Sequence, residues 1–157
     1  VGSGPFPTEL LDNDGDLLQS EGNEFGATTG RPRRCGWFDA LLVRQAVRLN
    51  GISSMAVMKL DVLDKFDTLK IAVSYRLSNG EHTENLPRSL ENVTPVLEEM
   101  PGWKCNSAGI TEYDQLPREM LAYLERISEL VGAKVSIIST GPKREETIVL
   151  NADQFWL

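Results

Sequence analysis

The sequence contains few of the residues and patterns on which metal scaffolds, disulfide scaffolds and membrane spans depend. Its 157 residues include one histidine and two cysteines, Cys35 and Cys105, which show neither metal-ligand spacing nor a paired framework. No apolar run approaches the about 20 residues that a helix needs to cross a bilayer. We therefore expect no bound transition metal and no membrane association. Two unpatterned cysteines favour a reducing compartment, so we expect the protein in the cytoplasm.

Positive charge is also scarce. The chain carries 16 Lys and Arg residues against 23 Asp and Glu residues, which gives a net charge of -7. Proteins that bind nucleic acid generally show a basic footprint. The composition therefore argues against a nucleic-acid partner.

The chain opens at Val1 rather than at a methionine, and its first ten residues lack the positive flank and apolar stretch of a secretory signal. We expect a piece of a longer protein, either trimmed for expression or preceded by a part with a function of its own. Its length suits one domain or a large part of one. We expect a single unit over 1–157, with loops at 1–36 and an α/β region at 37–157.

The first half of the chain predicts one clear helix and one buried strand. In the loop-rich region, the Asp14-Gly15 pair predicts a short hairpin around 13–16. Asp39 is a suitable N-cap for a helix over 40–50 that Asn50-Gly51 would end. Residues 55–60 are almost continuously apolar, which is typical of a strand buried on both faces.

The second half repeats this order of helix and strand. Residues 69–85 predict a strand, a turn at Asn79-Gly80 and a return strand, and 86–115 are irregular, with a short helical stretch before 98–103. A helix over 117–131 ends at Gly132, a buried strand covers 133–140, and a last strand covers 147–150. A helix followed by a buried strand, seen twice, indicates an α/β domain with a largely parallel sheet.

Two polar segments follow the two buried strands. Lys59 and Asp61 close the first strand, and Ser139, Thr140 and Gly141 close the second. On an extended chain, residues two apart point to the same side, so the lysine and the aspartate would face one ligand together. A carboxylate there matches the N1–H and 2-amino donors of guanine, which adenine lacks, and a backbone N–H of 139–141 could donate to O6. An ordinary solvated strand end is the alternative for Lys59–Asp61 taken alone.

A third candidate site is the arginine-rich loop at 26–34. It combines two hydroxyls, two glycines and three arginines, Arg31, Arg33 and Arg34, in an otherwise acidic chain. Guanidinium groups bind carboxylates and phosphates through paired hydrogen bonds. A solvated basic patch that pairs with nearby acids is the alternative. The loop does not match the Walker A pattern.

Other candidates favour structural roles. His82 lies beside a predicted turn, and Trp37 and Trp103 are expected to pack in the core. The acids around 12–16 lack the terminal glutamate of an EF-hand loop. No serine lies in a Gly-x-Ser-x-Gly elbow. We therefore assign no catalytic residue and no metal ligand within these 157 residues.

Taken together, five stretches resemble one known family. GPFPTEL, GNEFGATTGRPRRCGWFD, KLDVLD, MPGW and ISTGP occur here in the order found in adenylosuccinate synthetase, from Val1 to about Leu150. The resemblance is to the C-terminal part of that enzyme. It implies an α/β fold: the C-terminal part of a P-loop-NTPase-like, mostly parallel sheet with flanking helices and long loops.

The resemblance also implies an activity. The family joins inosine monophosphate (IMP) to L-aspartate in purine biosynthesis, with GTP as co-substrate and Mg²⁺ as cofactor, and a homodimer is expected for the intact enzyme. GTP phosphorylates the 6-oxygen of the inosine base, and the aspartate amine then displaces phosphate. The family's phosphate loop, catalytic groups and magnesium site are expected outside this chain, which alone should be inactive.

By motif match, the family's binding roles fall on three segments. The aspartate loop corresponds to Ala27, Thr28, Thr29, Gly30, Arg31, Pro32 and Arg33, where Arg31 also borders IMP and Arg33 reaches toward GTP. The guanine-recognition segments correspond to Lys59, Leu60, Asp61, Ser139, Thr140 and Gly141. Pro32 stands where the family commonly has a basic residue, and proline would stiffen the loop.

Two other classes of function stay open at this point. One is a guanine-nucleotide-binding module without chemistry, and the other is an interaction domain whose motifs are idle. A glycine-rich phosphate loop upstream of Val1 would favour the ligase over both.

Overall fold

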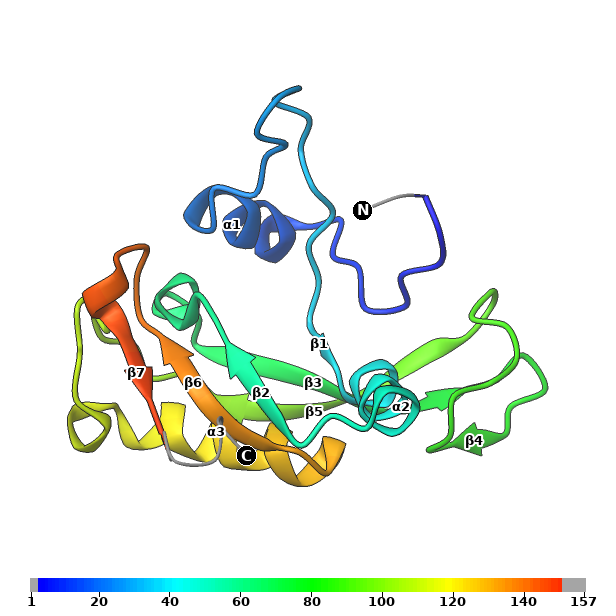
Figure 1. Ribbon diagram of the computed structural model, residues 1–157. Helices are drawn as coiled ribbons and strands as arrows, with labels where there is room; N and C mark the ends of the chain where they lie inside the picture. Colours follow the sequence, from blue (N-terminus) through cyan, green and yellow to red (C-terminus); the bar gives the residue numbers. More distant parts are fainter. Residues whose placement is uncertain (1–2, 151–157) are drawn as a thin grey trace. The chain divides into compact units, whose positions relative to one another are not determined.

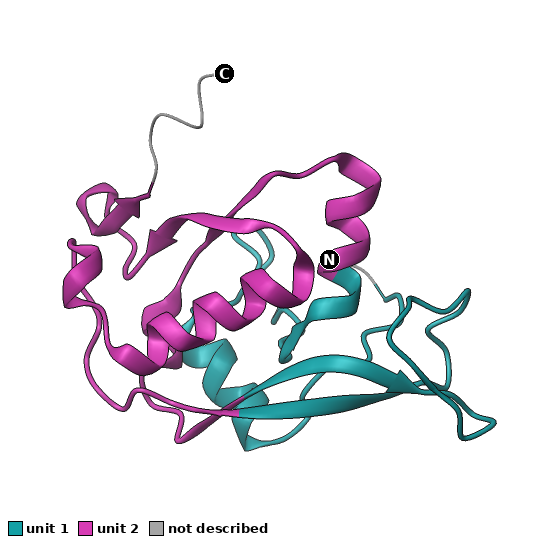
Figure 2. Cartoon of the chain, turned by 90° about the horizontal axis from the view of Figure 1, so that it is seen from below, with its two compact units in different colours: residues 1–42, 70–99 teal, residues 43–69, 100–157 magenta. Residues whose placement is uncertain are grey.

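The computed structural model describes residues 3–150 and divides the chain into two compact units (Figure 2). The first unit comprises Val1–Leu42 and Lys70–Glu99, drawn in teal, and the second comprises Val43–Leu69 and Met100–Leu157, drawn in magenta. Each unit is therefore assembled from two separate stretches of sequence.

The first unit begins with a helix where we expected a hairpin. Helix α1 spans Asn13–Glu21, and the Asp12 carboxylate caps it by accepting hydrogen bonds from the backbone N–H groups of Asp14 and Gly15. The hairpin prediction for 13–16 was wrong because the Asp-Gly pair forms the first helical turn. Gly15 is required there for a different reason: a Cβ would clash with the carbonyl of Leu10.

A four-stranded sheet lies mainly in the first unit. Strand β3 (Thr68–Arg76) pairs in parallel with β1 (Phe38–Asp39), antiparallel with β4 (His82–Thr83), and also with β5 (Thr94–Pro101) (Figure 1). The predicted strand, turn and return strand are confirmed, with Gly80 at a φ of 86° in the turn. The helical stretch expected before 98–103 was wrong, because this segment extends to pair with β3.

Helix α2 spans Ala40–Asn50, as the sequence predicted. The Asp39 carboxylate caps it by accepting from the N–H groups of Leu41 and Leu42, and Gly51 ends it with a φ of 62°. The second oxygen of Asp39 accepts a hydrogen bond from the buried hydroxyl of Tyr75 on β3. This aspartate therefore fixes the start of α2 to the sheet.

The second unit is built on a three-stranded sheet. Strand β6 (Lys134–Ser139) lies between β2 (Ser54–Val57), to which it is parallel, and β7 (Thr147–Val149), to which it is antiparallel. Helix α3 (Arg118–Val131) runs along one face of this sheet (Figure 1). The α/β class is thus confirmed, and each sheet combines a parallel pair with an antiparallel neighbour.

Helix α3 carries the core of the second unit. It follows Pro117 and ends at Gly132, which has a φ of 74°, both as predicted. The apolar spacing of the helix predicts a buried face of Met120, Leu121, Leu124, Ile127, Leu130 and Val131. Leu121 and Leu130 are only partly buried, while Tyr123 belongs to the core. The buried hydrophobic residues of the helix and of the sheet strands beside it are Met120, Tyr123, Leu124, Ile127, Val131, Ile138 and Ile148.

Three short 3-10 helices connect these elements: η1 (Leu60–Leu63), η2 (Tyr113–Gln115) and η3 (Arg144–Glu146). Trp37 and Trp103 are each 6% exposed, which confirms their predicted packing roles. His82 is exposed on β4. No helix within residues 3–150 is long and apolar enough to cross a membrane.

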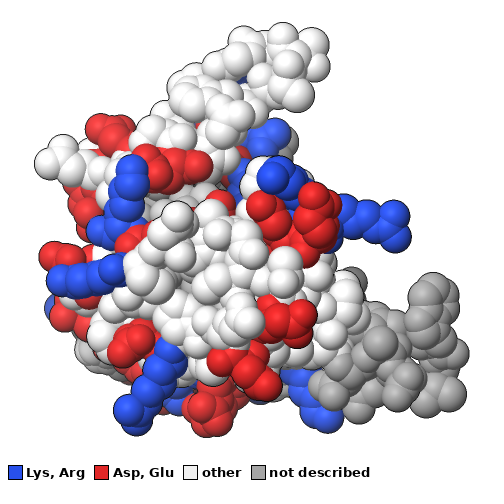
Figure 3. Space-filling model, turned by 90° about the vertical axis from the view of Figure 1, so that its left-hand side faces the viewer, with Lys and Arg blue, Asp and Glu red and all other residues white. Residues whose placement is uncertain are grey.

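Charged side chains of both signs lie on one face of the molecule. On the face drawn in Figure 3, the Lys and Arg side chains of the described residues are interspersed with Asp and Glu side chains. A mixed surface of this kind keeps local fields small.

Candidate guanine site and arginine loop

Two of the predicted site segments lie at one edge of the second unit's sheet. The parallel register pairs Val57, the last residue of β2, with Ile138 of β6. Residues 58–61 and 139–141 therefore leave the sheet at the same edge, where α/β proteins commonly bind ligands. The expectation that neighbouring strands bring these segments together is confirmed.

The local geometry of Lys59 and Asp61 differs from the extended arrangement that we expected. Strand β2 ends at Val57, Met58 is 54% exposed, and Lys59 adopts a left-handed conformation with φ 63° and ψ 40°. Asp61 lies in the first turn of η1, where Leu60 is 1% exposed. The strand prediction for 55–60 was too long. The chain turns at Lys59 and buries Leu60, so Lys59 and Asp61 do not lie on the extended segment that we expected.

One carboxylate oxygen of Asp61 stands out in the described part of the chain. This atom, Oδ1, is buried and has no hydrogen-bond partner among the residues that the structure describes. Burial raises the pKa of this carboxyl, and the negative charges of Asp64 and Glu146 raise it further. A hydrogen bond from the backbone of Asp61 and the positive charge of Lys59 act in the opposite direction. A buried carboxylate oxygen without a donor is costly, so the site is chemically suited to a ligand that brings N–H groups.

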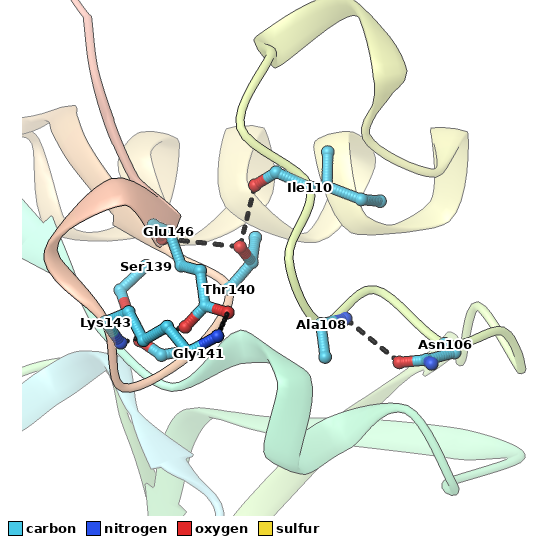
Figure 4. A network of polar contacts seen from close by, with 8 residues as sticks. All are labelled: Asn106, Ala108, Ile110, Ser139, Thr140, Gly141, Lys143 and Glu146. Atoms are coloured by element: carbon cyan, nitrogen blue, oxygen red, sulfur yellow. Dashed lines mark hydrogen bonds and ion pairs between the residues drawn. The ribbon is translucent and has the colours of Figure 1, made fainter.

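The segment 139–141 forms a closed turn (Figure 4). The Ser139 hydroxyl donates to the carbonyl of Gly141 over 2.7 Å, and the backbone N–H of Thr140 donates to the carbonyl of Glu146 over 3.0 Å. The N–H of Thr140 is thus already engaged, so the backbone donor that we expected from 139–141 is not that of Thr140. At Gly141 a Cβ would contact the carboxylate of Glu146, so a larger residue there would displace that side chain.

Glu146 and Asp64 belong to this site, and our reading of the sequence missed both. The Glu146 side chain is only 14% exposed and accepts a hydrogen bond of 2.8 Å from the backbone N–H of Lys143. Asp64 is the C-cap residue of η1, three residues after Asp61. The sequence did contain a signal for Asp64, because it is an acidic residue three positions after Asp61. The burial of Glu146 depends on the fold of its own loop and has no such signal.

The arginine loop is a short loop of the first unit that is closed by backbone hydrogen bonds. Phe25 and Pro32 form an isolated antiparallel bridge. The N–H of Gly26 donates to the carbonyl of Arg31 over 2.8 Å, and the N–H of Gly30 donates to the carbonyl of Gly26 over 2.8 Å. Gly30 adopts a φ of 62°, which glycine tolerates best. Residues 27–33 are all exposed. The loop therefore offers its side chains to solvent from a backbone that is closed by its own hydrogen bonds.

The three arginines of this loop differ in their partners. Arg34 is held by the carboxylate of Glu9 and by the carbonyl of Gly4, and its guanidinium lies over the ring of Phe6. Arg33 pairs with Glu24 over 2.9 Å. The side chain of Arg31 makes no hydrogen bond or ion pair with the described residues. Arg31 is the arginine of this loop most available to a ligand.

Residues 1–148 match the family model of adenylosuccinate synthetase. The chain belongs to the adenylosuccinate synthetase family. It is 52% identical over 153 residues to an adenylosuccinate synthetase from Trichlorobacter lovleyi and 54% identical over 153 residues to one from Haemophilus ducreyi. In both comparisons the match covers 96% of this chain and 35% of the relative.

A solved structure gives the same result for the fold. The fully ligated adenylosuccinate synthetase from Plasmodium falciparum matches 95% of this chain with a TM-score of 0.90 at 34% identity, over 37% of its own length. The chain thus spans about a third of the length of these adenylosuccinate synthetases.

Proposed function

We propose that this chain provides the guanine-recognition and aspartate-recognition parts of a GTP-dependent ligase. The reaction joins IMP and L-aspartate to form adenylosuccinate, a step in the synthesis of purine nucleotides. The observation that carries the proposal is the buried Oδ1 of Asp61, which lacks a partner among the described residues and lies at the sheet edge beside 139–141.

The base is selected by hydrogen bonding at this edge. Guanine offers N1–H and a 2-amino group on one edge, and the carboxylate of Asp61 accepts from both. Adenine brings no such pair of donors, so the site excludes ATP by leaving Asp61 unsatisfied. Lys59 lies beside the base with its exposed side chain, and the turn at Ser139–Gly141 forms the opposite wall of the site.

Aspartate is bound by the arginine loop, residues 27–33. Arg31 supplies an uncommitted guanidinium for a substrate carboxylate and borders the IMP site, while Thr28 and Thr29 offer hydroxyl donors. By the family resemblance Arg33 contributes to GTP binding. Its ion pair with Glu24 is half exposed and weak, so a phosphate group can take the place of the carboxylate. Pro32 limits the range of loop conformations.

The magnesium ion that the family's reaction requires is not assigned to this chain. Within residues 3–150 no group of three or more His, Cys, Asp or Glu side chains is arranged to hold a metal ion. The catalytic groups are likewise assigned to other parts of the ligase. Homodimer formation and a cytoplasmic location remain expectations from the family resemblance.

The proposal is tested with the chain alone and with a chimera in which it replaces the matching third of a bacterial relative. We expect no adenylosuccinate from the chain alone when it is mixed with GTP, IMP, aspartate and Mg²⁺. The chimera should turn over with GTP and not with ATP. Turnover by the purified chain, or equal use of ATP by the chimera, would contradict the proposal.

A further inference from the structure

The two segments of the proposed guanine site are connected through a third segment of the second unit. Residues 103–110, which we name the bracket, contact Asp64, the C-cap residue of η1, at one end and the turn at 139–141 at the other. Strand pairing fixes β2 against β6 only as far as Val57 and Ile138, whereas both site segments lie beyond that last pair. The bracket therefore provides a connection where the sheet no longer does.

The first joint of the bracket is the carboxylate of Asp64. It accepts hydrogen bonds from the indole N–H of Trp103 over 2.6 Å, from the backbone N–H of Ser107 over 2.7 Å, and from the Ser107 hydroxyl over 2.6 Å. Ser107 is fully buried. On the other side, the backbone N–H of Asp64 donates to the carbonyl of Asp61 over 3.2 Å. Asp64 thus joins the turn that carries Asp61 to the bracket.

The second joint is the hydroxyl of Thr140 (Figure 4). Thr140 is fully buried, and its Oγ1 donates to the carbonyl of Ile110 over 2.7 Å, with the carbonyl of Glu146 farther away at 3.3 Å. Within the bracket, the N–H of Ile110 donates to the carbonyl of Ser107 over 3.2 Å. Hydrogen bonds therefore run without interruption from Asp61 through Asp64 and the bracket to Thr140.

We propose that Asp64 and Thr140 are positioning residues that set the distance between Asp61 and Gly141, and with it the preference for guanine. Their polar groups are already engaged inside the protein, so they act through the residues beside them. This inference rests on the proposed guanine site. A carboxylate accepts two hydrogen bonds from a base edge only when its position is well defined. A buried hydrogen-bond network in which every member has a partner is rigid and can provide that position.

Nucleotide affinity tests the second joint. Thr140→Val removes the hydroxyl at nearly constant volume, and Thr140→Ser retains it. We measure affinities of the 157-residue chain for GTP and for ITP, which lacks the 2-amino group. We expect Thr140→Val to lower the GTP-to-ITP affinity ratio by about three- to tenfold, the size of one hydrogen bond, and Thr140→Ser to restore it.

A matched control separates positioning from stability. Ser128→Ala removes a hydrogen bond of 2.9 Å from the Ser128 hydroxyl to the carbonyl of Ala133, at the end of α3. We expect it to lower the melting temperature without changing the affinity ratio. An unchanged ratio in Thr140→Val would overturn the proposal. If that variant does not fold, Ser107→Ala replaces it, because it retains the backbone donor to Asp64 and loses only the hydroxyl.

Amide exchange tests the bracket without any nucleotide. If the joints are coupled, Thr140→Val accelerates hydrogen exchange of the Ser107 N–H, which is bonded to Asp64, whereas Ser128→Ala does not. Unchanged exchange at Ser107 would overturn the bracket. If exchange accelerates but the unmodified chain does not prefer GTP to ATP, the bracket stands as a structural connection and the proposed guanine site fails.

Discussion

Arg34 and Glu9 are joined by two hydrogen bonds, from Nε to Oε1 over 2.7 Å and from Nη2 to Oε2 over 2.6 Å. The two residues are 25 positions apart, so this ion pair fixes the base of the arginine loop to the segment that precedes α1. The neighbouring Arg31 makes no such contact with the described residues. One cluster of arginines thus combines a structural member with one that is available to a ligand.

The first prediction concerns stability. Arg34→Leu should lower the melting temperature by a few degrees at pH 7, whereas Arg31→Leu should leave it nearly unchanged. The guanidinium of Arg34 lowers the pKa of Glu9, so the pair stabilises the fold above the ordinary glutamate pKa of 4.5. The deficit of Arg34→Leu should therefore shrink as the pH falls through that lowered pKa. Melting curves at several pH values measure it, and equal deficits for both variants would contradict it.

The second prediction concerns substrate binding. In the active chimera, Arg31→Leu should reduce kcat/KM for aspartate by about ten- to a hundredfold, because one or two charge-assisted hydrogen bonds are lost. Arg33→Leu should act more on GTP than on aspartate. Arg31→Lys is the control that retains the charge and loses the paired geometry. Normal kinetics in Arg31→Leu would favour a solvated basic patch.

The third prediction concerns the hydrogen bond between Tyr75 and Asp39. Tyr75→Phe leaves a buried oxygen of Asp39 without a donor, so it should reduce the free energy of unfolding by about 1–3 kcal/mol. Tyr113, which is 42% exposed, provides the matched control, and Tyr113→Phe should change stability by less than about 0.5 kcal/mol. Urea unfolding measures both. Equal effects would show that Asp39 does not depend on this partner.

The fourth prediction concerns the stability cost of the proposed guanine site. Because burial raises the pKa of Asp61, the folded state binds more protons than the unfolded state between the ordinary pKa of 3.8 and the raised value. Stability therefore falls as the pH rises through this window. Asp61→Asn removes that cost and should match or exceed the wild-type melting temperature at pH 7. The difference should vanish below pH 3.8, and a variant less stable at pH 7 would contradict this account.

The sequence predicted those parts of the fold that depend on local signals. Helices α2 and α3 have apolar residues at helical spacing, suitable residues at their starts and glycines at their ends, so they were placed to within about one residue. Helix α1 was missed because its Asp14-Gly15 pair is equally typical of a turn. Strand β5 was missed because its extended form depends on pairing with β3, which no short stretch encodes.

The candidate site was predictable in its position and not in its details. Two buried strands, each followed by polar residues, were enough to place 59–61 and 139–141 at one sheet edge. The left-handed turn at Lys59 follows from the burial of Leu60, which a continuous apolar run does not reveal. The role of Asp64 depends on Ser107, 43 residues away, so it arises only from tertiary structure.

The central claim is that the Asp61 carboxylate recognises the guanine base. The most direct test compares two nucleotides that differ at position 2 of the base. Affinities of the wild-type chain and of Asp61→Asn are measured for GTP and for XTP, whose base carries a carbonyl oxygen in place of the 2-amino group. An amide donates to that oxygen, so Asp61→Asn should lose GTP affinity by about ten- to a hundredfold and gain affinity for XTP relative to GTP. A variant that binds GTP as well as the wild type, with no gain for XTP, would contradict the account.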